Sequence, residues 1–210
     1  MNLPNKITTF RMVMVIVLIL LLTICGGLNF TGPYLWGNEE TGVSLIRFIA
    51  FVLFIAASVS DFLDGYFARK LNLVTTYGKF MDPIADKLLV DSLLIFYALP
   101  INQEAFGFVG KTGIPLVFVV IMIARDLVVD AVRMIAMEKN IVIAASWFGK
   151  TKTVLQMVAI SLVLLNNWPF VYLGWSVNVT NIICALAGIV SLASGIDYLV
   201  KSRELFMGDK

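Results

Sequence analysis

Six long apolar runs, separated by short polar connections, dominate the hydrophobic pattern of this 210-residue chain. A helix needs about 20 mostly apolar residues to cross a bilayer, and each run is close to that length or longer. The connections carry helix-breaking residues such as Gly32-Pro33, Pro100 and Pro169. The pattern therefore predicts six transmembrane helices, over residues 12–28, 43–70, 78–99, 114–137, 147–166 and 175–200.

The composition agrees with a membrane protein. Hydrophobic residues make up 60% of the chain and charged residues only 14%, whereas about a quarter of the residues in a soluble domain are charged. We expect an all-α integral membrane protein with one domain over residues 1–210. The first apolar run lacks a small-residue cleavage site, so we expect it to be retained as a span.

The segment before the first run has an amphipathic pattern. Apolar residues recur at helical spacing from Leu3 to Met14, with Thr8 and Arg11 on another face. Residues 1–11 are therefore predicted to form a short helix in the cytoplasmic membrane interface. The pattern leaves open whether this segment only anchors the chain or also lines a functional site.

The positive charges are unevenly distributed between the two sides. With six spans both termini share one side, which receives twelve of the 16 Lys and Arg residues, whereas the opposite connections receive Arg47 and Lys111. Cytoplasmic connections are enriched in Lys and Arg, so we expect both termini in the cytoplasm. The twelve are Lys6, Arg11, Arg69, Lys70, Lys79, Arg133, Lys139, Lys150, Lys152, Lys201, Arg203 and Lys210.

The chain has no His and two cysteines. Without imidazole groups, Ser-His triads and the usual zinc sites are excluded. Cys25 and Cys184 lie in separate apolar runs, so we expect packing roles and no disulfide.

Four aspartates stand where the second and third runs approach the connection between them. Asp61 and Asp64 share one helix face, and so do Asp82 and Asp86. The two helices are predicted to be antiparallel neighbours, so both pairs point into one space near the cytoplasmic boundary. An ionisable group at the centre of a membrane helix costs at least about 2.5–3.5 kcal/mol, which indicates a functional site. Clustered carboxylates predict Mg²⁺, Mn²⁺ or Ca²⁺, and four of them are enough for two ions in phosphoryl transfer.

The same stretch carries a specific motif. Asp61-x-x-Asp64-Gly65-x-x-Ala68-Arg69, followed after eight residues by Gly78-x-x-x-Asp82-x-x-x-Asp86, resembles the signature of the CDP-alcohol phosphotransferase family at all nine positions. Members of that family are membrane enzymes that transfer a substituted phosphate from a CDP-linked donor to an alcohol and release CMP. By themselves, small residues in a membrane helix favour close helix packing; beside the aspartates and Arg69 they favour room for a ligand.

The resemblance implies roles for the motif residues. Two divalent ions, Mg²⁺ or Mn²⁺, would be held by Asp61, Asp64, Asp82 and Asp86. Asp86 would also be the general base that activates the acceptor hydroxyl. The CDP donor would be contacted by Gly65, Ala68, Arg69, Thr75 and Gly78. The resemblance also implies a homodimer.

Four cations outside the motif are candidates for binding a phosphate on the acceptor. They are Arg125, Arg133, Lys150 and Lys152. Arg gives a bidentate contact to phosphate and Lys a point charge. Two alternatives stay open: Arg133 and the two lysines are also what membrane orientation predicts, and Arg125 has Asp126 or Asp130 as a partner.

Weaker similarity points to one branch of the family. The stretches "DPIADKLL", "ARDLVVDAVR" and "GKTKT" resemble the phosphatidylglycerophosphate synthases, which join CDP-diacylglycerol to glycerol 3-phosphate. This implies a transferase of phospholipid biosynthesis in the cytoplasmic (inner) membrane, with its active site facing the cytoplasm and no nucleic-acid partner. An inositol phosphate is the nearest alternative acceptor; serine and inositol fit less well.

Two other classes compete with an enzyme. A cation-coupled transporter would also place carboxylates among spans, but such folds often show inverted repeats, which this sequence lacks. A membrane scaffold with structural Ca²⁺ is the other alternative.

Overall fold

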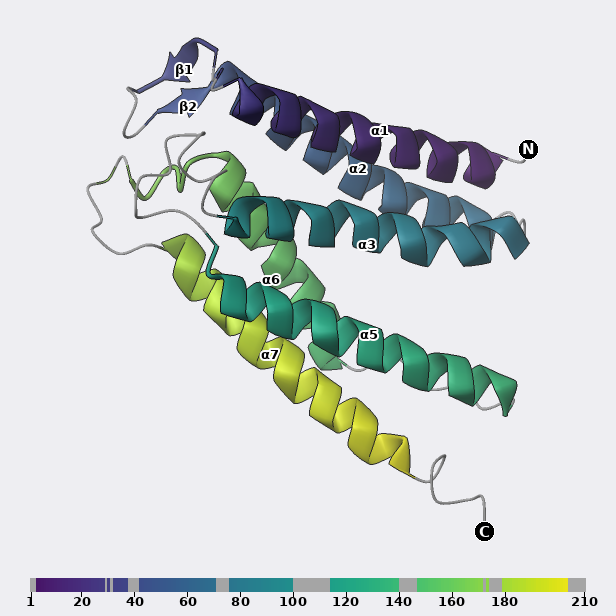
Figure 1. Cartoon of the computed structure of the whole chain (residues 1–210). Helices are drawn as coiled ribbons and strands as arrows, with labels where there is room; N and C mark the ends of the chain where they lie inside the picture. Colours follow the sequence, from purple (N-terminus) through teal and green to yellow (C-terminus); the bar gives the residue numbers. More distant parts are fainter. Residues whose placement is uncertain are drawn as a thin grey trace.

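A bundle of long helices with a small hairpin at one end forms the structure, a computed structural model that describes residues 3–28, 30, 32–37, 42–70, 76–99, 114–139, 147–171, 173 and 179–203 (Figure 1). The described part contains six helices: α1 (Leu3–Gly27), α2 (Leu45–Lys70), α3 (Thr76–Ala98), α5 (Leu116–Glu138), α6 (Trp147–Leu164) and α7 (Val179–Lys201). The hairpin consists of β1 (Tyr34–Trp36) and β2 (Val43–Ser44).

Successive helices run in opposite directions (Figure 1). The start of α1, the end of α2, the start of α3, the end of α5 and the end of α7 therefore lie toward one end of the bundle. This arrangement brings the motif-bearing parts of α2 and α3 to the end where the chain begins and where α7 finishes.

The predicted helices are confirmed, with two corrections at the N-terminal side. The separate interfacial helix predicted over residues 1–11 is wrong, because α1 continues from Leu3 to Gly27 without interruption. Its single proline, Pro4, lies in the first turn, where proline is tolerated, and no glycine follows before Gly26. The hairpin was also not predicted; β1 and β2 pair antiparallel, with Tyr34 opposite Ser44.

The interior and the outer surface of the bundle are both apolar. One core cluster includes residues of all six helices, for example Leu18, Phe54, Leu94, Ile160 and Cys184. Cys184 belongs to this cluster and Cys25 packs against it, which confirms the prediction of packing roles. The helices also carry large apolar side chains on their outer faces, such as Leu127 and Ile196, which are 65% and 62% exposed. An apolar outer surface of this extent is what a lipid environment requires.

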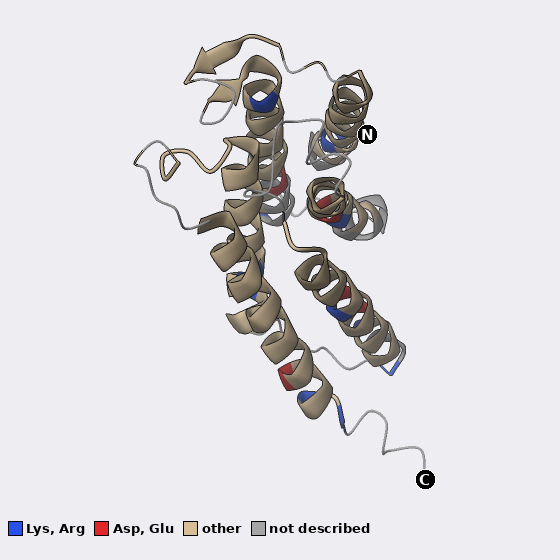
Figure 2. Cartoon of the chain, turned by 60° about the vertical axis from the view of Figure 1, so that its left-hand side comes forward, with Lys and Arg blue, Asp and Glu red and all other residues tan. Residues whose placement is uncertain are grey.

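Three helices are long and apolar enough to cross a membrane by themselves, over Lys6–Gly27, Leu45–Leu63 and Val179–Lys201, within the residues the structure describes. The helices outside this set, α3, α5 and α6, carry most of the charged residues within the bundle. On α7, by contrast, the charged residues gather at the C-terminal end (Figure 2). The charged residues of α3, α5 and α6 include those that line the candidate site described below.

Candidate functional site

A cavity of about 250 Å³ opens between α3, α5, α6 and α7. It is lined by the proposed general base and by all four predicted acceptor-binding cations, namely Asp86, Arg125, Arg133, Lys150 and Lys152. Helical periodicity explains how each helix contributes: on α5, residues Arg125, Val129 and Arg133 are spaced by four and share one face. These five groups come from three helices, and the structure brings them into one cavity.

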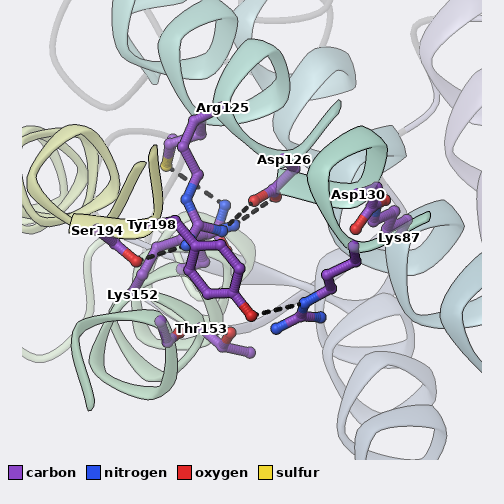
Figure 3. A network of polar contacts seen from close by, with 12 residues as sticks. Lys87, Arg125, Asp126, Asp130, Lys152, Thr153, Ser194 and Tyr198 are labelled. Atoms are coloured by element: carbon purple, nitrogen blue, oxygen red, sulfur yellow. Dashed lines mark hydrogen bonds and ion pairs between the residues drawn. The ribbon is translucent and has the colours of Figure 1, made fainter. Parts of the chain in front are cut away.

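Asp126 is the centre of the polar network beside this cavity (Figure 3). Its carboxylate accepts a hydrogen bond from Nη1 of Arg125 at 2.8 Å and another from Nζ of Lys152. The side chains of all three residues are at most 12% exposed. Of the alternatives left open for Arg125, the structure therefore shows pairing with Asp126.

Arg125 and Arg133 also contact α7. Nη2 of Arg125 donates a hydrogen bond to the hydroxyl of Ser194, and Nε of Arg133 donates one to the hydroxyl of Tyr198 at 3.0 Å. The guanidinium carbon of Arg133 lies 5.3 Å from the centre of the Tyr198 ring, within the range of a cation–π contact. Two arginines of α5 are thus held by two residues of α7 (Figure 3).

The two lysines of α6 have different environments. Lys152 is 5% exposed and bound to Asp126, whereas Lys150 is exposed. On the opposite wall of the cavity, Lys87 of α3 forms an ion pair with Asp130 of α5. The cavity therefore combines a buried, internally paired charge network with an exposed cation at its edge.

Asp61 lies on α2 and is paired with a residue of α1. Its carboxylate forms an ion pair with Arg11, whose side chain is fully buried while that of Asp61 is 37% exposed. Arg11 of the N-terminal segment therefore contacts the first aspartate of the motif, whereas a role of this segment in lining the site stays a prediction. Asp61 is not among the residues that line the cavity.

The remaining motif residues are only partly described. The backbone of Asp64, Gly65, Ala68 and Arg69 belongs to α2, and that of Gly78 and Asp82 to α3, but their side chains lie outside the described part. Thr75 lies outside the described residues altogether. The convergence of all four aspartates stays a prediction.

The donor atoms of the described aspartates suit a hard divalent ion. Asp61 and Asp86 offer carboxylate oxygens, which Mg²⁺ and Mn²⁺ prefer. The guanidinium group of Arg11 forms an ion pair with Asp61, so a positive charge already lies beside this carboxylate. Among the described side chains, no three His, Cys, Asp or Glu residues come together as a metal site. The side chains of Asp64 and Asp82 are not among those described.

Comparison with known sequences identifies the family. The sequence model of the CDP-alcohol phosphatidyltransferases matches residues 1–192. The chain belongs to this family. All nine motif positions of the CDP-alcohol phosphatidyltransferase signature fall within the matched residues.

Individual family members are similar over most of their length. A Bacillus subtilis protein named CDP-diacylglycerol–glycerol-3-phosphate 3-phosphatidyltransferase is 35% identical over 206 residues, which cover 97% of this chain and 96% of that protein. A Rickettsia bellii protein of the same name is 32% identical over 207 residues, covering 98% and 97%. A Mycoplasma pneumoniae protein of that name is 36% identical over 160 residues, covering 76% of this chain and 66% of its own length.

The contacts of α7 and the contact of Asp126 with Lys152 were not predicted from the sequence, whereas Asp126 had been named as a possible partner of Arg125. Ser194 and Tyr198 lie in an apolar run that was interpreted only as a span. The available signal was the spacing of small and polar residues on α7, since Ser191, Ser194, Gly195 and Tyr198 share one face and are buried. In membrane helices such residues mark the packed face.

Proposed function

We propose that this chain transfers the phosphatidyl group of CDP-diacylglycerol to glycerol 3-phosphate and so forms phosphatidylglycerophosphate and CMP. The cavity carries this proposal, because it combines one carboxylate for the acceptor hydroxyl, Asp86, with four cations for an acceptor phosphate. The names of the similar Bacillus, Rickettsia and Mycoplasma proteins support the same substrates.

Asp86 is the proposed general base of the reaction. It takes the proton of the acceptor hydroxyl as that oxygen forms a bond to the phosphorus next to diacylglycerol, and the bond from this phosphorus to CMP breaks. A positioned carboxylate of this kind contributes roughly 10²–10⁴-fold to a rate. Direct attack, without a covalent enzyme intermediate, needs no further nucleophile from the chain.

The acceptor phosphate is proposed to bind to Arg125, Arg133, Lys150 and Lys152. The arginines supply paired N–H donors that match two phosphate oxygens. Lys150, exposed at the cavity edge, attracts the anion from the aqueous side. This division of roles holds the phosphate at one end of the cavity and leaves the acceptor hydroxyl at the end where Asp86 stands.

The donor and the metal are assigned to the motif. Asp61, Asp64, Asp82 and Asp86 would hold two ions, Mg²⁺ or Mn²⁺, and Gly65, Ala68, Arg69, Thr75 and Gly78 would contact the CDP group. When bound, the ions neutralise the diphosphate and stabilise the departing CMP. Arg11 keeps the charge of Asp61 compensated by an ion pair within the chain.

The placement in the membrane completes the proposal. We propose one domain over residues 1–210 with six spans, with both termini and the active site on the cytoplasmic side of the cell membrane, and with a homodimer as the assembly. Alternating helix directions support shared sides for the termini (Figure 1). A lipid donor then enters from the bilayer and a water-soluble acceptor from the cytoplasm.

Release of CMP tests the reaction class. Protein purified in detergent is incubated with CDP-diacylglycerol, Mg²⁺ and glycerol 3-phosphate, and CMP is measured together with the lipid product. We expect CMP and phosphatidylglycerophosphate in equal amounts, and no product without either substrate. The absence of CMP release with every phosphorylated alcohol would contradict an enzyme and favour a transporter.

A further inference from the structure

The contacts between α5 and α7 assign a role to a helix that the reaction itself does not use. We infer that Ser194, Gly195 and Tyr198 of α7 form a positioning surface that sets where Arg125 and Arg133 meet the acceptor phosphate. This inference rests on the proposed function and adds specificity-determining residues to it.

Arg125 is held against α7 at several points. Its two terminal nitrogens are directed to different partners, because Nη1 bonds Asp126 and Nη2 bonds Ser194. Its aliphatic part lies over Gly195, where an added Cβ would be 2.9 Å from Cγ of Arg125. Real Cβ atoms do not come so close to another carbon, so any side chain at position 195 would push Arg125 away from Ser194. The absence of a side chain at Gly195 is therefore a condition for the observed position of the guanidinium group.

Arg133 is held by a rigid group. Tyr198 is 2% exposed and packs in a small cluster with Val129, Val132 and Ala136 of α5. Its hydroxyl accepts a hydrogen bond from Nε of Arg133, and its ring lies under the guanidinium group. A buried ring fixes the long arginine side chain and so lowers the entropy lost when the arginine binds phosphate. The hydrogen bond uses Nε, so it does not occupy the two terminal nitrogens of Arg133, and both residues line the cavity.

The chain contains a matched control for the close approach at Gly195. One heptad earlier on α7, a Cβ at Gly188 would lie 2.8 Å from a ring carbon of Phe118, which itself precedes Arg125 by one heptad on α5. Both glycines thus let α7 approach α5, but Gly188 faces Phe118, which does not line the cavity, whereas Gly195 faces Arg125, which does. A methyl group at Gly188 disturbs the same helix interface without touching an arginine.

The experiment measures the KM of each substrate for Gly195→Ala, Tyr198→Phe and Gly188→Ala. Tyr198→Phe keeps the ring and removes only the hydroxyl acceptor. We expect Gly195→Ala and Tyr198→Phe each to raise the KM for glycerol 3-phosphate about tenfold, the effect of one hydrogen bond to a charged group, while the KM for CDP-diacylglycerol changes by less than about twofold. We expect Gly188→Ala to keep the wild-type ratio of the two KM values.

The outcomes separate the inference from the function on which it rests. Parallel changes in both KM values, or the same shift in Gly188→Ala, would overturn the positioning role. If Gly195→Ala does not fold, Tyr198→Phe decides alone.

If the wild type transfers to no phosphorylated alcohol, the proposed function fails. A second measurement then tests the inference: whether inorganic phosphate protects the purified protein against thermal unfolding. Loss of that protection in Tyr198→Phe but not in Gly188→Ala supports it, and equal protection in both contradicts it.

Discussion

Arg11 of α1 forms an ion pair with Asp61 of α2 from a position that is completely buried in the bundle. The contact joins the N-terminal segment to the first aspartate of the family motif. Arg11 therefore contacts a motif residue directly, although neither Arg11 nor Asp61 lines the cavity. Because Arg11 pairs with Asp61, the negative charge of Asp61 is compensated within the protein.

Replacing Arg11 tests this compensation. Without the guanidinium group the carboxylate of Asp61 keeps its charge and loses its partner, which costs about 1–3 kcal/mol of stability. We expect Arg11→Gln to unfold at a lower temperature than the wild type in the absence of divalent ions, and to gain more from added Mg²⁺. Lys6→Gln, which removes an exposed cation of the same helix, is the control. An equal Mg²⁺-dependent gain in both variants and the wild type would show that Arg11 does not share Asp61 with a metal ion.

Asp86 is the proposed general base. Asp86→Asn keeps the shape of the side chain but cannot take the acceptor proton, so we expect kcat to fall by roughly 10²–10⁴-fold. Mg²⁺ should still raise the unfolding temperature, because three motif aspartates remain. Asp91→Asn, which changes another carboxylate that lines the cavity, should lower kcat far less. A wild-type rate for Asp86→Asn would show that the proton goes elsewhere.

Arg125 is expected to act on only one of the two substrates. Removal of its charge by Arg125→Ala should raise the KM for glycerol 3-phosphate by about tenfold or more, because a charge-assisted contact to phosphate is lost. The KM for CDP-diacylglycerol should change much less. The control is Arg203→Ala, which changes an exposed residue two positions after the end of α7. Equal effects of Arg125→Ala on both KM values would contradict the assignment.

Asp126 is expected to compete with the acceptor phosphate for the same cations. In Asp126→Asn, Arg125 and Lys152 lose their shared carboxylate, and unpaired buried charges cost about 3–5 kcal/mol. We expect a lower unfolding temperature for this variant and a larger stabilisation by added glycerol 3-phosphate than in the wild type.

The control for Asp126→Asn is Asp197→Asn. Asp197 forms an ion pair with Lys201, whose side chain is 63% exposed, and an exposed pair contributes about 0–1 kcal/mol. This variant should unfold close to the wild type and respond to glycerol 3-phosphate in the same way. If Asp126→Asn behaves like Asp197→Asn, the network does not hold the cations for the ligand.

The local pattern of the sequence predicts the helices well, because each apolar run is long and the breakers between runs are strong. The prediction that the second helix extends past Ser60 to Lys70, and so includes the first part of the motif, is confirmed. The end of the fifth predicted helix near Asn166 also agrees with the structure, where α6 ends at Leu164 and Asn166 and Asn167 have positive φ. Asparagine adopts this conformation more readily than most residues.

Contacts between distant helices are harder to predict. Arg125 and Arg133 were selected for their charge and their depth along the chain, and both line the cavity. The partners Ser194 and Tyr198 were missed, because one helix pattern does not tell which helix its packed face will meet. Arg11 illustrates the same limit, since its partner Asp61 lies 50 residues later in the sequence. Small and polar residues at helical spacing on α7 are the signal that points to such a face.

The choice of acceptor is the central claim, and a panel of acceptors tests it most directly. Purified protein with CDP-diacylglycerol and Mg²⁺ is offered glycerol 3-phosphate, inositol phosphate, serine, inositol or phosphatidylglycerol, and kcat/KM is measured for each with the lipid product identified by mass. The account predicts the highest kcat/KM for glycerol 3-phosphate, with phosphatidylglycerophosphate as the product. A higher kcat/KM for any other acceptor in the panel would contradict it.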